Sequence, residues 1–221
     1  MSAVDDSLLS ERLAALVRDI RGCRICRDAP RGTPLPHEPR PVFRVSETAR
    51  ICICSQAPGT RVHASGTPFT DPSGDRLRAW MGVTPEDFYD TRRIAIVPMG
   101  FCFPGLNEKG GDLPPRAECA PAWHRLLFAA LPQFELILLV GYYSQRWHLG
   151  DRANPSLTET VANWRDYAQG AGTPRYMPMP HPSWRNNGWL RQNPWFDAEL
   201  LPFLRGEVRR LMAFRSLGGA A

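Results

Sequence analysis

Apolar residues follow two patterns along the chain, and the first is the spacing of an amphipathic helix. Residues 8–21 place apolar side chains every three or four positions, at Leu9, Leu13, Leu16, Val17 and Ile20. Ser7 precedes this stretch and is a suitable N-cap. The pattern predicts an N-terminal helix. A surface loop should follow over residues 28–41, where five prolines remove backbone donors and fix φ.

The second pattern is a set of short, nearly continuous apolar runs, which is typical of strands buried on both faces. Three runs are strong, namely RICICS at 50–55, IAIVPM at 94–99 and ELILLVG at 135–141. A fourth, RYMPMP at 175–180, is weaker because its prolines cannot donate to a central ladder. We therefore expect four strands.

Helical patterns follow these strands at residues 73–82, 117–131, 142–149 and 197–212. In the second of these, one predicted face carries Trp123, Leu126, Leu127 and Ala130. Strands that alternate with helices predict a three-layer α/β/α sandwich around a central, mainly parallel four-stranded sheet. We expect one domain over residues 1–221, with residues 1–45 as its N-terminal helix and proline-rich loop and residues 215–221 as a frayed tail.

The composition is that of a globular protein rather than a disordered or membrane-spanning one. Of the 221 residues, 43% are hydrophobic and 22% are charged, and no apolar run approaches the roughly 20 residues of a membrane span. Residues 1–22 lack the pattern of a secretion signal, so we expect a cytoplasmic protein with reduced thiols. We also expect a monomer without a membrane partner. The net charge of +5 suits a polyanionic partner without requiring one.

The loop after the first strand is the first candidate for chemistry, because ligands of open α/β sheets bind at the carboxyl ends of the strands. It reads Gln56-Ala57-Pro58-Gly59 and continues to GTPFTDPSGD at 66–75. The Ala-Pro-Gly turn lets a ligand approach the backbone, and Phe69 offers a face for stacking. The alternative is a tight turn in which Phe69 only plugs the core.

The loop after the fourth strand is the second candidate. Its His181 stands at the end of a strand between two prolines, where an N–H can donate to an anion that develops in the crevice. The side chains that follow can contact phosphates, namely Ser183, Arg185 and Asn186. The alternative is a structural histidine.

Four cysteines form a third constellation. Cys23 and Cys26 stand three residues apart after the first helix, and Cys102 and Cys119 flank the loop after the second strand. A tight and a loose pair can close an all-cysteine site for an iron–sulfur cluster or zinc, and the alternative is four unrelated thiols. Cys52 and Cys54 alternate along a strand and are interpreted as small buried apolar residues.

Together these segments resemble a known family. QAPG…GTPFTDPSGD and MPHPSWRNN, with ARICIC before the first and NPWFDAELLPFLR near the chain end, are similar to motifs A and B of the uracil-DNA glycosylase superfamily. The four cysteines resemble those of its family 4, the iron–sulfur branch. The resemblance extends from about Cys23 to about Leu211.

The resemblance implies a role for each segment. A nucleotide with a damaged base is flipped out of DNA and its base stacks on Phe69, beside a rigid loop at residues 57–59. His181 stabilises the departing base as an anion, and Ser183, Trp184 and Arg185 enter the minor groove with Trp184 as the wedge. The cysteines would hold a [4Fe-4S] cluster, with zinc or no metal as alternatives.

One position departs from the family 4 pattern. Gln56 stands where that family has a carboxylate that orients the attacking water, and an amide cannot act as a base. Asp71 is the nearest acid that can replace it, although Asp71 can equally be the N-cap of the helix near Ser73. The leading hypothesis is a glycosylase for uracil or another deaminated base. The rivals are a DNA-damage-binding protein with little or no activity and, on the same fold, an unrelated small-molecule hydrolase.

Overall fold

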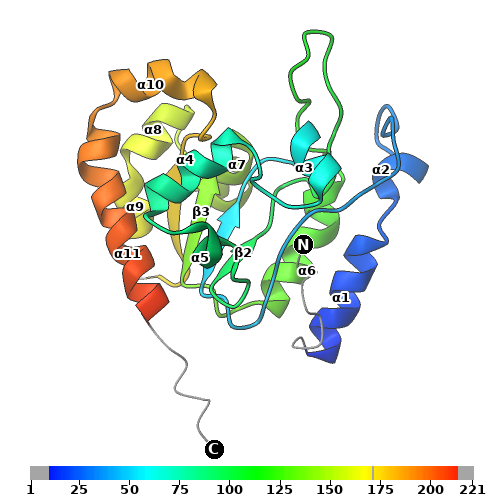
Figure 1. The fold of residues 1–221 in the computed structure, drawn as a ribbon, viewed down its shortest axis with the longest axis horizontal. Helices are drawn as coiled ribbons and strands as arrows, with labels where there is room; N and C mark the ends of the chain where they lie inside the picture. Colours follow the sequence, from blue (N-terminus) through cyan, green and yellow to red (C-terminus); the bar gives the residue numbers. More distant parts are fainter. Residues whose placement is uncertain (1–9, 171, 214–221) are drawn as a thin grey trace, which may run out of the picture.

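The protein is built around a four-stranded parallel sheet, as the apolar runs predict. The computed structural model describes residues 10–170 and 172–213. The strands have the spatial order β2-β1-β3-β4, with β1 at Ile51–Cys54, β2 at Ile94–Ile96, β3 at Leu136–Val140 and β4 at Arg175–Met179 (Figure 1). The proline-containing β4 lies at an edge, with Pro178 opposite Leu139. A missing donor there costs little, because nothing pairs with the outer side of an edge strand.

Helices surround the sheet (Figure 1). Their bounds are α1 Glu11–Arg21, α2 Ile25–Asp28, α3 Thr60–Ser65, α4 Pro72–Met81, α5 Pro85–Tyr89, α6 Cys119–Ala130, α7 Tyr142–Leu149, α8 Leu157–Ala162, α9 Trp164–Ala168, α10 Asn187–Gln192 and α11 Leu201–Ala213. Short 3₁₀ helices occupy Gly150–Arg152 and Trp184–Asn186, and a π-helical segment occupies Phe196–Leu200.

Alternate residues of β1 divide the core into two halves, one on each face of the sheet. Ile51 and Ile53 pack with side chains of α4, α5, α8, α9 and α11. Cys52 and Cys54 pack on the other face with α1, α6 and α7, and neither is accessible to solvent. The three-layer α/β/α sandwich is therefore confirmed, and so is the burial of these two cysteines.

The predicted helices are largely confirmed, and the differences concern the start of the first helix and the buried face of α6. The first begins at Glu11 and is capped by Ser10, whose Oγ accepts a hydrogen bond from the Leu13 N–H. Ser7, residues 8 and 9 and the predicted tail at 215–221 lie outside the described residues. The helix predicted at 142–149 has those bounds, and 197–212 falls within the π-helical segment and α11.

The buried face of α6 is a correction. Leu126, expected on that face, is 53% exposed, whereas His124 and Leu127 are buried. The face follows the spacing of residues 120, 124, 127 and 131. Sequence pattern does not favour a histidine at such a position, but the His124 Nε2 lies 3.0 Å from the Pro98 carbonyl oxygen, which supplies a hydrogen bond inside the core.

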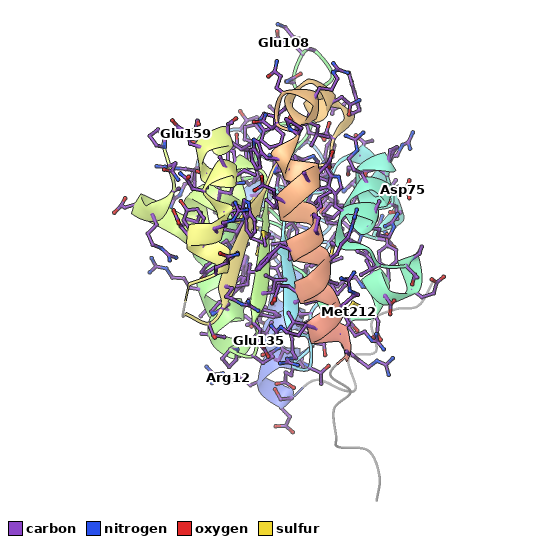
Figure 2. The ribbon with its side chains drawn as sticks, turned by 90° about the vertical axis from the view of Figure 1, so that its left-hand side faces the viewer. Arg12, Asp75, Glu108, Glu135, Glu159 and Met212 are labelled. Carbon is purple, nitrogen blue, oxygen red and sulfur yellow. The ribbon has the colours of Figure 1, made fainter. Side chains whose placement is uncertain are left out.

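Several loops meet at the carboxyl end of the sheet. Figure 2 shows Glu108, in a loop that projects from this end, far from Glu135, which immediately precedes β3. Within the described ranges, no helix is long and apolar enough to cross a membrane.

Candidate active site

Two adjoining pockets lie where β1 and β4 end. The first, here called the inner pocket, has a volume of about 70 Å³ and is lined by the predicted residues Ala57, Pro58, Gly59, Phe69, Asp71 and His181, with Asp112 among their neighbours. The second, the outer pocket, has about 280 Å³ and is lined by Gln56, Ala57, Asp112, Leu113, His181, Ser183, Arg185 and Asn186. The structure thus brings the two predicted loops together, although they are more than 100 residues apart in the sequence.

Phe69 is held in an unusual backbone conformation at the inner pocket. Its φ of 57° lies in the left-handed region, which is costly for a bulky residue and persists only when the surroundings enforce it. The Phe69 carbonyl oxygen is 3.3 Å from the Arg78 Nη1 and 3.1 Å from the Tyr89 hydroxyl, which donate to it. The ring meets Phe88 edge-on at 5.8 Å. Phe69 is therefore both a core side chain and a wall of the pocket.

Asp71 is the N-cap of α4. Its Oδ1 accepts hydrogen bonds from the backbone N–H groups of Ser73 at 3.1 Å and Gly74 at 3.2 Å, and from the Ser73 hydroxyl. The Oδ2 takes no part in these three bonds. The capping role is therefore observed, and the same carboxylate also lines the inner pocket.

His181 lines both pockets, and the loop around it is held by its own polar groups. The Asn186 Nδ2 donates to the His181 carbonyl oxygen at 2.6 Å, and the Arg76 Nη1 donates to the Ser183 carbonyl oxygen at 3.0 Å. Burial lowers the pKa of His181, and the charge of Asp71 opposes this only in part. The ring is therefore neutral at pH 7 and has one N–H to donate.

Gln56 lies only in the outer pocket. Its amide packs on the backbone of Gly141, where an added Cβ would lie 2.8 Å from the Gln56 Nε2. An amide here can orient a water molecule in the outer pocket, but it cannot take a proton from it.

Trp184 projects from the surface beside the outer pocket. It is 72% exposed, and the Arg185 guanidinium lies 5.8 Å from the centre of its ring. An exposed indole next to a pocket can contact a molecule that binds there.

Asp112 lines both pockets but belongs to neither of the two loops predicted from the sequence. It follows Gly110 and Gly111 in a loop without a periodic pattern of apolar residues. The one sequence feature that could have indicated a role for this loop is its position after the second strand, at the end of the sheet where ligands bind. Burial raises the pKa of the Asp112 carboxyl, against the opposing effect of the Arg185 charge.

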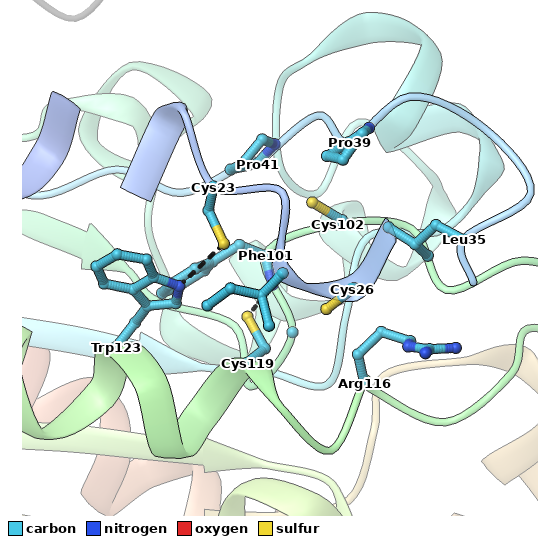
Figure 3. A pocket seen from close by; sticks show the side chains of 12 residues that line it. Cys23, Cys26, Leu35, Pro39, Pro41, Phe101, Cys102, Arg116, Cys119 and Trp123 are labelled. Atoms are coloured by element: carbon cyan, nitrogen blue, oxygen red, sulfur yellow. Dashed lines mark hydrogen bonds between the residues drawn. The ribbon is translucent and has the colours of Figure 1, made fainter. Parts of the chain in front are cut away.

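The four cysteines line one pocket on the opposite side of β1 from Phe69. Figure 3 shows the Sγ atoms of Cys23, Cys26, Cys102 and Cys119 around a common space. None is in a disulfide. Two of the sulfurs accept hydrogen bonds at 3.3 Å, Cys23 from the Trp123 indole N–H and Cys119 from the Phe101 backbone N–H. Burial raises the pKa of the Cys102 thiol to about 12. Within the described residues, no three His, Cys, Asp or Glu side chains meet closely enough to hold a single metal ion.

A family model describes most of this chain. The model of the uracil DNA glycosylase superfamily matches residues 43–205, about three quarters of the sequence. The chain belongs to the uracil DNA glycosylase superfamily. Both loops of the candidate active site, the whole sheet and Asp112 lie inside the matched range, whereas Cys23 and Cys26 precede it. Uracil DNA glycosylases act on DNA, and both pockets are built mainly from residues inside the matched range.

We expect Asp71 to act mainly as a cap. Asp71→Ala should lower the free energy of unfolding by about 1 kcal/mol, whereas Asp71→Asn should change it little, because asparagine caps a helix as well as aspartate. Any base-excision activity of the protein should fall less than about tenfold in Asp71→Asn. Denaturant unfolding and single-turnover kinetics measure the two effects. A loss of roughly 10² to 10⁴ in rate at unchanged stability would instead identify Asp71 as the general base.

Proposed function

We propose that the protein is a DNA glycosylase that hydrolyses the N-glycosidic bond of uracil or another deaminated base flipped out of DNA, and leaves an abasic site. The observation that carries this proposal is the meeting of Phe69 and His181 in one pocket of a uracil DNA glycosylase fold. An aromatic wall recognises a flat base, and a neutral N–H donor recognises the charge that the base acquires on leaving.

The proposed reaction needs no nucleophilic side chain. The base enters the inner pocket against Phe69, and the bond between its nitrogen and the sugar breaks with the electron pair going to the base. The His181 N–H donates to a base oxygen as that charge builds. Water then adds to the sugar carbon. The first loop offers Gln56 and the Asp71 Oδ2, which takes no part in the three capping bonds, to orient this water.

DNA is the proposed partner. The outer pocket would hold the sugar and its phosphates, with Arg185 supplying charge and the loop at Ser183 and Asn186 supplying hydrogen bonds. Trp184 would fill the space that the flipped nucleotide leaves in the duplex. Because the net charge is only +5, most of the attraction to DNA must come from this local surface and should weaken with salt.

We propose that the cysteine pocket holds a [4Fe-4S] cluster. Four thiols that are free of disulfides surround it, and two N–H groups point at their sulfurs, as around the sulfur ligands of such clusters. The cluster would tie the segment around α2 to the loop after β2 and so would be structural. Zinc also accepts four thiolates and is the alternative occupant, but the four sulfurs would have to move closer together to hold a single ion.

Protein purified without oxygen is expected to be brown and to contain about four irons and four sulfides per chain. Cys26→Ser should lose this iron. Cys52→Ala is the matched control, because Cys52 is also a buried free cysteine but lies outside the cysteine pocket. Iron and zinc analysis checks the outcome. A colourless protein with one zinc per chain would mean that the four cysteines are the ligands but that the metal is zinc. A metal-free protein of normal stability would mean that the cysteines do not form a metal site.

The reaction is tested with a panel of DNA duplexes that carry uracil, hypoxanthine, xanthine or mismatched thymine. With enzyme in excess, we expect an abasic site in at least one duplex, most readily the one that contains uracil. If only a duplex with a deaminated purine is cleaved, the proposed reaction is correct but uracil is not the substrate.

A DNA-damage-binding protein is the second candidate, and Gln56 is the observation that favours it, because a site without a working base binds without cleaving. Tight, salt-sensitive binding to uracil-containing or abasic duplexes with no excision in a single turnover would establish it. The absence of any DNA binding would point to an unrelated small-molecule hydrolase.

A further inference from the structure

The inner and outer pockets share three lining residues, Ala57, Asp112 and His181. If the base occupies the inner pocket and the sugar with its phosphates occupies the outer pocket, the glycosidic bond must cross between them. The shared residues therefore surround the bond that breaks. Two of the three are ionisable, and the mechanism above uses only His181.

Asp112 reaches this junction from a folded hairpin rather than a loose loop. The Leu113 N–H donates to the Gly105 carbonyl oxygen at 2.9 Å, and the Asn107 N–H donates to the Gly111 carbonyl oxygen at 2.8 Å. The Asn107 Oδ1 accepts from the N–H groups of Lys109 and Gly111, each at 2.9 Å. These bonds fix the base of the hairpin, so the position of Asp112 is defined by the fold.

The carboxylate of Asp112 points at the backbone of the first loop. A Cβ added to Gly59 would lie 3.2 Å from the Asp112 Oδ2, so the glycine leaves the space that the carboxylate uses. In the described part of the chain, this carboxylate accepts no hydrogen bond and forms no ion pair within bonding distance. It is therefore available to a water molecule or a substrate.

The other two candidates for holding water are less suited to take its proton. The Oδ1 of Asp71 already accepts three hydrogen bonds as a helix cap. Gln56 carries an amide, which has no basic site. Asp71 lines only the inner pocket, whereas the carboxylate of Asp112 lines both pockets.

We propose that Asp112 is the catalytic base of the site, holding the attacking water at the junction of the two pockets and taking its proton. This inference rests on the proposed function. As the carbon–nitrogen bond breaks, its electron pair leaves with the base. The negative charge of Asp112 stabilises the cationic sugar, the water oxygen bonds to the sugar carbon, and one water proton passes to the carboxylate. The proton is later released to solvent or to the expelled base.

The test is single-turnover excision from a uracil-containing duplex by the full-length protein. Asp112→Asn should slow excision by roughly 10² to 10⁴, the usual contribution of a general base. Its affinity for a duplex with an abasic-site analogue should stay within about threefold, and Asp112→Glu should recover part of the rate. Glu108→Gln is the matched control, because it removes a carboxylate from the same hairpin outside both pockets and should leave the rate unchanged.

The pH profile separates a base from a merely structural aspartate. Asp112 acts in its ionised form, so the wild-type rate should fall as the pH drops through its raised pKa. The groups that face Asp112 are Asp71, His181 and Arg185. Asp112→Asn should lose this acid limb, while Asp71→Asn should keep it.

The outcomes distinguish the inference from the function on which it rests. If the wild-type protein excises uracil and Asp112→Asn does so within about threefold, or with the same acid limb, the assignment of Asp112 is wrong and the glycosylase stands. If the wild-type protein binds the duplexes and cleaves none, the glycosylase itself is wrong, and Asp112 has no water to activate.

Discussion

Replacing His181 with alanine is expected to slow single-turnover excision about 100-fold or more, with little change in stability or in DNA affinity. The reason is that one preorganised donor aimed at a developing anion contributes roughly 3 kcal/mol to the transition state in a site that excludes water. Burial keeps the His181 ring neutral by lowering its pKa. Its single N–H therefore gains most of its strength when the base leaves.

A control variant is needed to distinguish a loss of catalysis from a loss of folding. His63→Ala is a suitable control, because His63 lies on the neighbouring helix α3 but lines neither pocket. Both variants should unfold at nearly the wild-type denaturant concentration, and only His181→Ala should lose activity. Normal excision by His181→Ala would mean that another donor stabilises the departing base.

The effect should also depend on pH in a defined direction. The histidine pKa is lowered in the folded protein, so protonation of His181 opposes folding as the pH falls. Above that lowered pKa the ring is neutral in the free enzyme. Lowering the pH should therefore not increase the rate through formation of a histidinium.

The sheet and the two loops were predictable from sequence because each has a strong local cause. Strands that are buried on both faces must be nearly continuous in apolar residues, and β1 to β3 are. The prolines of β4 made it the weakest of the four predicted strands. They are tolerated because β4 lies at an edge of the sheet. Active-site loops follow from topology, since the carboxyl ends of parallel strands meet at one side.

The features that sequence did not predict depend on contacts between distant parts of the chain. Asp112 reaches the pockets only because its hairpin folds back over Gly59. His124 occupies a core position only because the Pro98 carbonyl is there to meet it. Neither partner is near in sequence, so no local pattern reveals the pair. Short helices such as α3 and α9 were missed for a similar reason, since helices of this length are stabilised mainly by tertiary packing.

Gly74→Ala is expected to be the most damaging small substitution in the site. A Cβ at this position would lie 1.9 Å from the Phe69 carbonyl oxygen and 2.8 Å from the Phe69 Cβ. The first of these is a backbone atom, so no side-chain rotation relieves the overlap. Either the first turn of α4 moves or Phe69 leaves its left-handed conformation, and in both cases the pocket wall shifts.

We expect this variant to lose about 3 kcal/mol of stability, at the upper end of what overpacking usually costs, and to excise poorly even where it remains folded. Gly206→Ala is the matched control. It lies in α11, and the added Cβ would point into open space beside the helix, so alanine there should stabilise the helix by up to about 1 kcal/mol. Denaturant unfolding of both variants, followed by single-turnover excision, gives the comparison. If Gly74→Ala were as stable and active as wild type, Phe69 would have to move freely. The strained backbone at Phe69 would then have no part in forming the pocket.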